Sequence, residues 1–485
     1  MRRFFQNVFA ETPMCRQLSI VLAFCLVPLL AFPRKVSLRK LQTTGLPVVV
    51  VETEGHEEPT CEFLRIDSGY PGNTIRNATK VPGRVLVVQG LDTLYDSGPW
   101  LEDVSGMTVK MRGNSSAFRV KHPFKLKLQK KADMLTRGND AKYKDKDWLL
   151  LDGSTLNMLT GMMVSRMMEL QWTPAYKYVN LLFNGDYRGI YILCESVKRN
   201  PRCRLDVSED QGFIIEKDVY WWNADLYFQS RTSQRNYTFK YPDSDNLTDT
   251  FIDYVQGRVT DWERSVADGT YDRHIDVASF AAWLLAHDLL GNADAAGSNI
   301  YVTCRDSTSK LEMGNLWDLD TNYYRYDEWA TIHTWWDFPF GAMLESPNPS
   351  FACAYIAKWD SVSPWLFRRI EASLDSFLIT DCYRALERSR RIENDSIGFR
   401  FPTIAEGVDE ARRWFARREE WLSGAMSAFA AHVDTVVAAV VAPRLPHAPV
   451  GRRAYRLDGL PATSVPGTTA RHPFLIKDGK KIIIK

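Results

Sequence analysis

The spacing of hydrophobic and polar positions changes along the chain from strand-like to helix-like. In the first half, apolar runs and apolar–polar alternation predict strands at residues 46–52, 85–89, 107–112, 124–131, 148–152 and 212–218. Two further strands, within residues 179–195, flank Asn184, Gly185 and Asp186, a composition typical of a β-hairpin turn. The N-terminal part is therefore predicted to be rich in β-structure.

Helical spacing dominates the second half of the chain. It predicts helices at residues 156–171, 247–269, 277–290, 365–377, 381–394 and 408–441. Ser154 or Thr155 can cap the first of these, and its row of Met residues is interpreted as core. Strands followed by helices predict an α+β fold with two lobes, β-rich at the N-terminus and α-rich at the C-terminus.

One acidic residue and an Asn follow the apolar helix 277–290 at short intervals. Gly291 marks the end of this helix, and Asp294 and Asn299 come directly after it. This Asp-x₄-Asn spacing is also that of a protein kinase catalytic loop, where the Asp accepts a hydroxyl proton and the Asn holds metal. Asp and Asn are also common in helix caps and turns, which is the alternative interpretation.

An acidic pair lies close behind. Residues 300–303 predict a strand, and another strand-like segment ends in Asp318 and Asp320. Carboxylates and a carboxamide at the ends of neighbouring elements predict an oxygen-rich site suited to Mg²⁺, which takes few protein oxygens and leaves room for phosphate.

A small-residue loop with basic neighbours precedes one of the predicted strands. Residues 113–123 form this loop, and in the strand 124–131 the side chains of Lys125 and Lys127 face away from the apolar side. A strand, a flexible loop and a strand that carries Lys are how kinases cover nucleotide phosphates. An ordinary hairpin with a solvated lysine face is the alternative.

Length, apolar content and net charge limit the kinds of protein that this chain can be. The chain has 485 residues, of which 45% are apolar, so it can bury a large core. Its formal net charge of +2 gives no general attraction to nucleic acid, and none is expected as a partner.

The N-terminus predicts export. An apolar run at residues 18–32 follows Arg2, Arg3 and Arg16, and its length suits a signal peptide rather than a membrane span. We therefore expect a signal peptide at residues 1–33 and a secreted, periplasmic or cell-surface protein. A form that keeps the signal or is lipid-anchored is the alternative.

Six Cys residues follow the signal segment, an even number that permits disulfides in an exported protein. Cys194 and Cys203 flank a short loop and are predicted to be a local pair. The absence of CxxC spacing makes a zinc site an unfavoured interpretation.

The C-terminal part differs from the rest in composition. From about residue 442 it is rich in Pro, Gly, Ala and Arg, and residues 473–485 predict a hairpin that turns at Asp478 and Gly479. The hairpin is interpreted either as a surface or partner-binding module or as a simple terminal strand pair.

In their joint order, several of these segments resemble the CotH kinase family, the spore-coat protein H relatives with an atypical protein-kinase-like fold. The matching segments are residues 112–116, 121–128, 148–152, 184–195, 212–218, 241–243, 292–299 and 317–320. Residues 478–485 resemble the C-terminal ends of exported proteins from Bacteroidales-type bacteria. The expected organisation is a β-rich segment at 34–105, a kinase-like domain at 106–435, and a linker with a hairpin tail at 436–485.

The resemblance implies an ATP- and Mg²⁺-dependent protein kinase acting on Ser or Thr of an unknown protein substrate. Asp294 matches the catalytic Asp and Asp318 the metal-binding Asp, with Asn299 and Asp320 as supporting ligands. The residues expected to contact the nucleotide are Arg112, Asn114, Ser115, Lys125 or Lys127, Glu195 and Glu216. The alternatives are a non-catalytic surface-binding protein on the same fold, and AMP transfer by the same residues.

Overall fold

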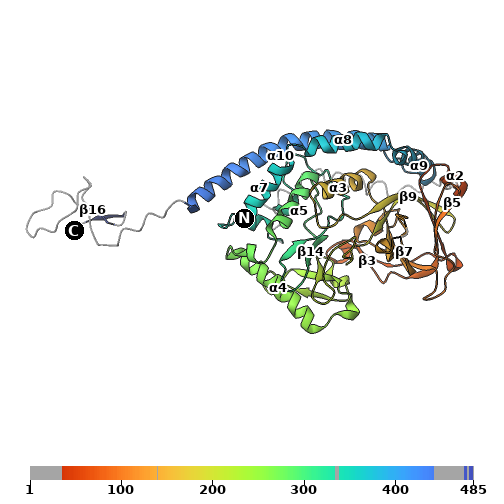
Figure 1. Cartoon of the computed structure of the whole chain (residues 1–485), viewed down its shortest axis with the longest axis horizontal. Helices are drawn as coiled ribbons and strands as arrows, with labels where there is room; N and C mark the ends of the chain where they lie inside the picture. Colours follow the sequence, from red (N-terminus) through yellow and green to blue (C-terminus); the bar gives the residue numbers. More distant parts are fainter. Residues whose placement is uncertain (1–34, 139, 334–337, 442–473, 478–479, 484–485) are drawn as a thin grey trace, which may run out of the picture. The chain divides into compact units, whose positions relative to one another are not determined.

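The computed structural model describes residues 35–138, 140–333, 338–441, 474–477 and 480–483 (Figure 1). The chain divides into two units, Met1–Ala430 and Ala431–Lys485. The predicted signal peptide at residues 1–33 lies outside the described residues. Among the described residues, no helix is both long and apolar enough to cross a membrane.

A closed barrel forms the N-terminal lobe. Its strands are β1 (Val48–Thr53), β4 (Val81–Gln89), β6 (Met107–Met111), β7 (Phe124–Ala132), β8 (Asp145–Leu151), β9 (Tyr176–Phe183) and β10 (Asp186–Glu195), and β5 (Asp92–Asp96) extends the sheet beside β4. Strand β1 pairs in parallel with β9 on one side and antiparallel with β4 on the other, so the sheet returns to itself.

Alternating side chains fill the barrel. In β7, Phe124, Leu126 and Leu128 are buried among the other inward-facing residues, whereas Lys125 and Lys127 point outward, as predicted. The predicted hairpin is also confirmed: β9 and β10 pair antiparallel across a turn in which Asn184 and Gly185 both have positive φ.

A five-stranded antiparallel sheet with surrounding helices forms the second lobe. Its strand order is β12 (Tyr227–Gln229), β13 (Asn236–Tyr241), β11 (Phe213–Lys217), β14 (Ile300–Cys304) and β15 (Leu311–Met313). The helices are α3 (Thr155–Met167), α4 (Asp249–Ala267), α5 (Val277–Leu290), α6 (Phe340–Leu344), α7 (Ser350–Val362), α8 (Leu366–Leu378), α9 (Asp381–Ile397) and α10 (Ile404–Val441). The predicted α+β organisation, strand-rich first and helical later, is confirmed.

Helix α5 lies at the centre of this lobe. All of residues 280–290 are buried, and Gly291 ends the helix in the left-handed conformation (φ 54°) that its sequence position predicts. Helix α7, which the sequence reading did not predict, packs against α5. The chain therefore leaves α5 from a fixed point in the core, directly before Asp294.

Shorter elements complete the described chain. They are α2 (Leu38–Gln42), β2 (Glu62–Leu64), β3 (Thr74–Arg76), and the antiparallel pair β16 (Phe474–Lys477) and β17 (Lys480–Ile483). The C-terminal pair confirms the two strands of the predicted terminal hairpin. The turn predicted at Asp478 and Gly479 lies outside the described residues.

Two predictions were wrong. The strand-like segment before Asp318 and Asp320 is not a strand, because β15 ends at Met313 and Asp318 has a left-handed backbone (φ 52°). The pair of Cys194 and Cys203 is not a disulfide either, and both are free. The Cys194 side chain is buried in the core, whereas the Cys203 thiol donates to the Lys142 carbonyl oxygen at 3.0 Å.

Candidate active site

A cavity of about 630 Å³ brings together most of the predicted site residues. Its lining includes Arg112, Asn114, Ser115, Glu216, Asp294, Asn299, Asp318 and Asp320. These residues come from the end of β6 and the turn after it, from β11, and from the loops that follow α5 and β15. The barrel and the second sheet therefore both contribute to one pocket, whose volume suits a small-molecule ligand.

The loop that carries Asp294 is tied to the loop that carries Asp318. The buried Asn292 donates from Nδ2 to the Asp318 carbonyl oxygen at 3.0 Å, and its Oδ1 accepts from the Asp294 amide at 2.9 Å. Thr321 Oγ1 accepts from the same amide at 3.0 Å. The backbone of Asp294 is thus held in a fixed position relative to residues 318–321.

Asn299 and Asp318 meet in this pocket. Nδ2 of Asn299 lies 3.2 Å from Oδ2 of Asp318, and the Asn299 amide donates to Glu216 Oε1 at 3.0 Å. Both Asn299 (φ 67°) and Asp318 (φ 52°) have left-handed backbones, a conformation that Asn and Asp tolerate better than most residues. Such conformations cluster at functional sites, where the surrounding contacts stabilise them.

The pocket concentrates negative charge in a recess. The Asp294 and Asp318 side chains remain open to solvent there, but the surrounding protein displaces much of the water around their carboxylates. Burial, together with the neighbouring Asp320 and Asp294, raises the pKa of Asp318 to about 7. Burial also raises the pKa values of Asp294 and Asp320, although Arg119 opposes the rise at Asp320 through its Nη1, 2.7 Å from Oδ2. The carboxylates therefore repel each other, and a bound cation would relieve the repulsion.

These residues fit a Mg²⁺ ion whose coordination shell is completed by a bound ligand. Among the residues that the structure describes, no group of three or more His, Cys, Asp or Glu converges closely enough to form an all-protein metal cage. Mg²⁺ usually takes one or two protein carboxylates and fills its other positions with water and phosphate oxygens. Asp318, Asp320 and the free Oδ1 of Asn299 supply the oxygen ligands that such a site needs.

The segment after β6 gives the pocket its small-residue wall. Gly113 has φ 94°, and a Cβ there would lie 2.3 Å from Ser116 Oγ, so the turn requires glycine. The 3₁₀ turn Ser115–Phe118 follows, and Asn114 is fixed by a hydrogen bond from Thr74 Oγ1 at 2.7 Å. This wall is compact and bears the positive charge of Arg112.

Lys240 is a pocket residue that the sequence reading missed. Its Nζ lies 2.7 Å from Glu216 Oε2. Burial opposes its charged form, but Glu216 and Asp218 raise the pKa of Lys240, so it stays protonated. Glu216 on β11 lies opposite Thr238 on β13, and Lys240 lies at the irregularity where the register between the two strands shifts. This pairing depends on strand register, which the sequence alone does not show.

Other pocket residues were missed for the same reason. They are Lys110, Arg119, Asp152, Asp218 and Tyr220. They come from several elements, and apart from Asp218 and Tyr220, which are two positions apart, no short spacing connects them.

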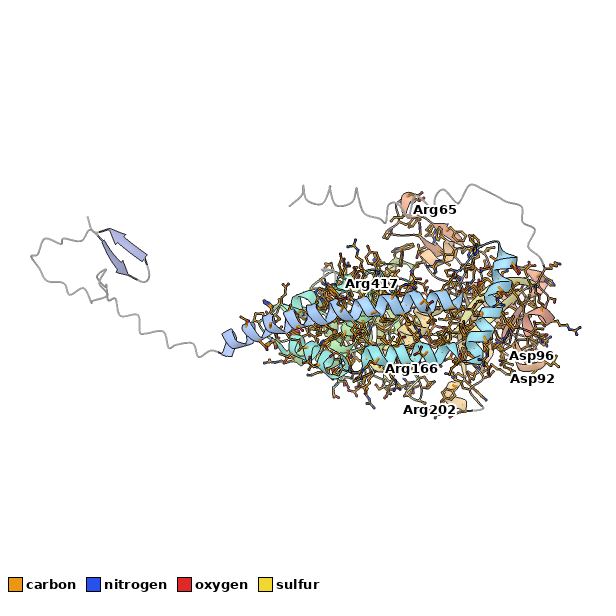
Figure 2. All side chains as sticks on the ribbon, turned by 90° about the horizontal axis from the view of Figure 1, so that it is seen from above. Arg65, Asp92, Asp96, Arg166, Arg202 and Arg417 are labelled. Carbon is orange, nitrogen blue, oxygen red and sulfur yellow. The ribbon has the colours of Figure 1, made fainter. Side chains whose placement is uncertain are left out.

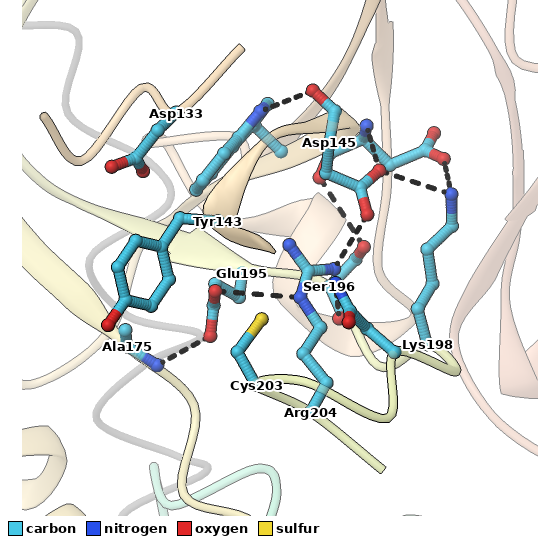
Figure 3. Close-up of polar contacts among 12 residues, drawn as sticks. Asp133, Tyr143, Asp145, Ala175, Glu195, Ser196, Lys198, Cys203 and Arg204 are labelled. Carbon is cyan, nitrogen blue, oxygen red and sulfur yellow. Dashed lines mark hydrogen bonds and ion pairs between the residues drawn. The ribbon is translucent and has the colours of Figure 1, made fainter. Parts of the chain in front are cut away.

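Three residues predicted to contact the nucleotide do not line the pocket. Lys125, on the outer face of the barrel, pairs with Asp147 at 3.0 Å, and Lys127 on the same face is exposed. Glu195 is buried in a separate charged cluster, where Arg137 Nη1 lies 2.9 Å from its Oε1. The Ala175 amide donates to Glu195 Oε2 (Figure 3). Arg204 lies beside it in the same cluster. These ion pairs hold the side chains away from the cavity.

Comparison with known proteins finds one family that matches this chain and a solved structure similar to it. The family described as CotH kinase protein matches residues 109–383. No protein with a curated description matches the chain. One similar solved structure is the HipA, HipB and operator DNA complex of the Shewanella oneidensis MR-1 toxin–antitoxin system, at 15% identity and a TM-score of 0.23. That match covers 61% of this chain and 61% of the solved chain.

Proposed function

This chain belongs to the CotH kinase family, and from that premise we propose that it transfers the γ-phosphate of ATP to a Ser or Thr hydroxyl of a protein. The observation that carries the proposal is the convergence of Asp294, Asp318 and Asp320 with Arg112 and Lys240 around one cavity. Phosphoryl transfer depends mainly on positioning and charge neutralisation, and this set of groups supplies both.

Asp294 is proposed as the group that accepts the hydroxyl proton of the acceptor. Its amide is fixed by Asn292 and Thr321, while its carboxylate opens into the cavity. Burial and Asp320 raise its pKa, which makes the carboxylate a better proton acceptor than a solvated Asp.

Asn299, Asp318 and Asp320 are proposed to hold Mg²⁺. A Mg²⁺ ion held by these residues would supply positive charge to offset the negative charge of the phosphoryl group being transferred. Asn299 can offer Oδ1 because its Nδ2 is directed at Asp318. Arg119 lines the same cavity with its Nη1 2.7 Å from Asp320 Oδ2, and its other N–H donors are proposed to contact phosphate.

Lys240 is proposed to contact the nucleotide phosphates in place of Lys125 or Lys127. Glu216 holds the Lys240 ammonium in the cavity and also accepts from the Asn299 amide, so one carboxylate positions both the lysine and the metal-binding loop. Arg112, Asn114 and Ser115 complete the proposed phosphate-binding wall.

Export is proposed as well, together with a protein acceptor and a possible association with the cell surface. The support is the apolar run at residues 18–32 behind an Arg-rich start. An exported kinase would meet its nucleotide either before export or outside the cell.

The test is to incubate the full chain with Mg²⁺, ATP and a mixture of Ser- and Thr-containing peptides and to identify the products by mass spectrometry. A phosphoryl group on Ser or Thr, formed only with Mg²⁺, is the expected result. An adenylyl group would instead indicate AMP transfer. No product and no Mg²⁺-dependent nucleotide binding would favour the non-catalytic binding protein.

A further inference from the structure

A second cavity lies outside the candidate active site, where three helices meet at the surface. It has a volume of about 680 Å³. Helix α3 contributes Met163, Arg166 and Met167, spaced as one helix face, and Lys358, Ser361 and Val362 of α7 have the same spacing. Arg369 and Ser373 of α8 form the third wall, and Trp365 lies at the junction of α7 and α8. We refer to this cavity as the helical groove.

The walls of the helical groove carry positive charge that is not neutralised. Arg166, labelled in Figure 2, and Arg369 are exposed, and neither guanidinium has an ion-pair or hydrogen-bond partner among the described residues. Lys358 lies 3.3 Å from Glu169, the single carboxylate of the lining. Three cations therefore face one carboxylate, and that carboxylate is itself highly exposed.

The floor of the helical groove is apolar. Val362 is 2% exposed, and Met163 and Met167 are half-buried and pack against the core of the lobe. Trp365 is 39% exposed, although its indole N–H is satisfied by the Ser361 carbonyl oxygen at 2.9 Å. Its ring is thus oriented by a hydrogen bond and still available to a ligand. Flexible Met side chains beside a fixed aromatic ring suit apolar side chains of varied shape.

From this combination we propose that the helical groove binds an acidic segment of a partner protein. The acidic side chains of the segment pair with Arg166 and Arg369, and its apolar side chains contact Trp365 and the two Met residues. Charge complementarity selects the partner, and the fork geometry of Arg favours carboxylates and phosphates in particular. An apolar groove bordered by helices is a common receptor for a short peptide segment.

Helix α3 connects the helical groove with the candidate active site. Met162 lines the active-site cavity, and the adjacent Met163 lines the groove. Since α3 has 13 residues, its length is about 20 Å. A partner bound in the groove would therefore be held near the active-site pocket, although binding in the groove does not require phosphoryl transfer.

The experiment measures binding of a short fluorescent peptide of alternating Glu and Leu to the full chain by anisotropy. We expect binding that weakens as salt is raised, and a loss of about tenfold or more in the double variant Arg166→Glu, Arg369→Glu. Arg202→Glu with Arg417→Glu is the matched control, because both are exposed Arg residues outside the groove (Figure 2) and the change in net charge is the same. The control should bind as the unchanged chain does.

Four results would overturn the proposal. The first is no binding of the acidic peptide to the unchanged chain, and the second is equal binding of the same peptide with Lys in place of Glu. The third is an equal loss in both double variants, since that would reflect overall charge and not the helical groove. Binding to anionic lipid vesicles without binding to the peptide would assign the cations to a membrane surface and would also overturn it. Melting temperatures show whether each variant folds. Substitution of these exposed Arg residues should leave the melting temperature unchanged.

Discussion

Asn299 and Asp318 join two loops that are 19 positions apart in the chain, through a 3.2 Å contact between Nδ2 and Oδ2. Both have left-handed backbones. Both residues line the same cavity. No sequence pattern marks these two residues as neighbours. They meet because the loops that carry them begin where α5 ends, at Gly291, and where β15 ends, at Met313.

Asp294→Asn should lower phosphoryl transfer by about a hundredfold to ten-thousandfold, the usual contribution of a general base. Nucleotide binding should be nearly unchanged, because the amide contacts that fix the loop involve the backbone of residue 294. Rate measurements and calorimetry with Mg²⁺-ATP would check both parts. Asp92→Asn, on the exposed strand β5 (Figure 2), is the matched control and should keep full activity.

Asp318→Asn should remove the Mg²⁺ dependence of nucleotide binding and should stabilise the metal-free protein. The pKa of Asp318 is about 7 in the folded chain, above its ordinary value, so its ionisation destabilises the fold as pH rises toward 7. Thermal melts without metal should therefore show a larger gain for the variant at pH 8 than at pH 5. A gain that is equal at both pH values would contradict the raised pKa.

The raised pKa of Asp318 also predicts that protons compete with Mg²⁺ for its carboxylate. Binding of Mg²⁺ requires ionised Asp318, so the affinity of the protein for Mg²⁺ should fall as pH is lowered from 8 to 6. Calorimetric titration at the two pH values measures this, and Asp318→Asn should show weak binding with no such pH dependence.

Lys240→Met and Lys125→Met distinguish the two lysine assignments. Lys240 lines the cavity and pairs with Glu216, whereas Lys125 pairs with Asp147 outside it. We expect Lys240→Met to weaken nucleotide binding by about tenfold or more, as expected for loss of a charged hydrogen bond. Lys125→Met should leave binding unchanged. The opposite pattern would restore the assignment that was predicted from the sequence.

Whether a feature could be predicted from the sequence depends on how far apart in the chain its contacting residues lie. Local patterns predicted α5, its end at Gly291 and the alternation in β7, because these depend on neighbours within a few residues. The pair of Glu216 and Lys240 depends on the register between β11 and β13, and no spacing in the chain encodes it. Lys125 was favoured because it lies near the small-residue loop in sequence, yet its strand turns it toward Asp147.

The loop before Asp318 shows the same limit. Residues 315–320 resemble the end of a strand in composition, with apolar residues leading into the Asp pair, but the positive φ of Asp318 breaks the extended conformation. That conformation is stabilised by tertiary contacts, among them the bond from Asn292 to the Asp318 carbonyl oxygen. Sequence patterning identified the carboxylates, whereas the geometry that orients them arises only in the folded chain.

Gly161→Ala tests whether packing behind the metal-binding loop matters. A Cβ at Gly161 in α3 would lie 2.3 Å from Leu319 Cδ1, between Asp318 and Asp320 in the chain. Although Ala favours a helix over Gly by about 1 kcal/mol, we expect loss of stability and of activity, because Leu319 must move. Gly257→Ala in α4 meets no atom within 4 Å and should stabilise instead. Equal effects of the two substitutions, measured by thermal melts, would refute this packing argument.

The central claim is that the cavity around Asp294 and Asp318 performs γ-phosphoryl transfer. The most direct test uses ATP labelled separately on the γ- and α-phosphates, with Mg²⁺, the full chain and its Asp294→Asn variant. The account predicts transfer of γ label to protein, dependent on Mg²⁺ and lost in the variant. Transfer of α label, or γ transfer that the variant retains in full, would contradict it.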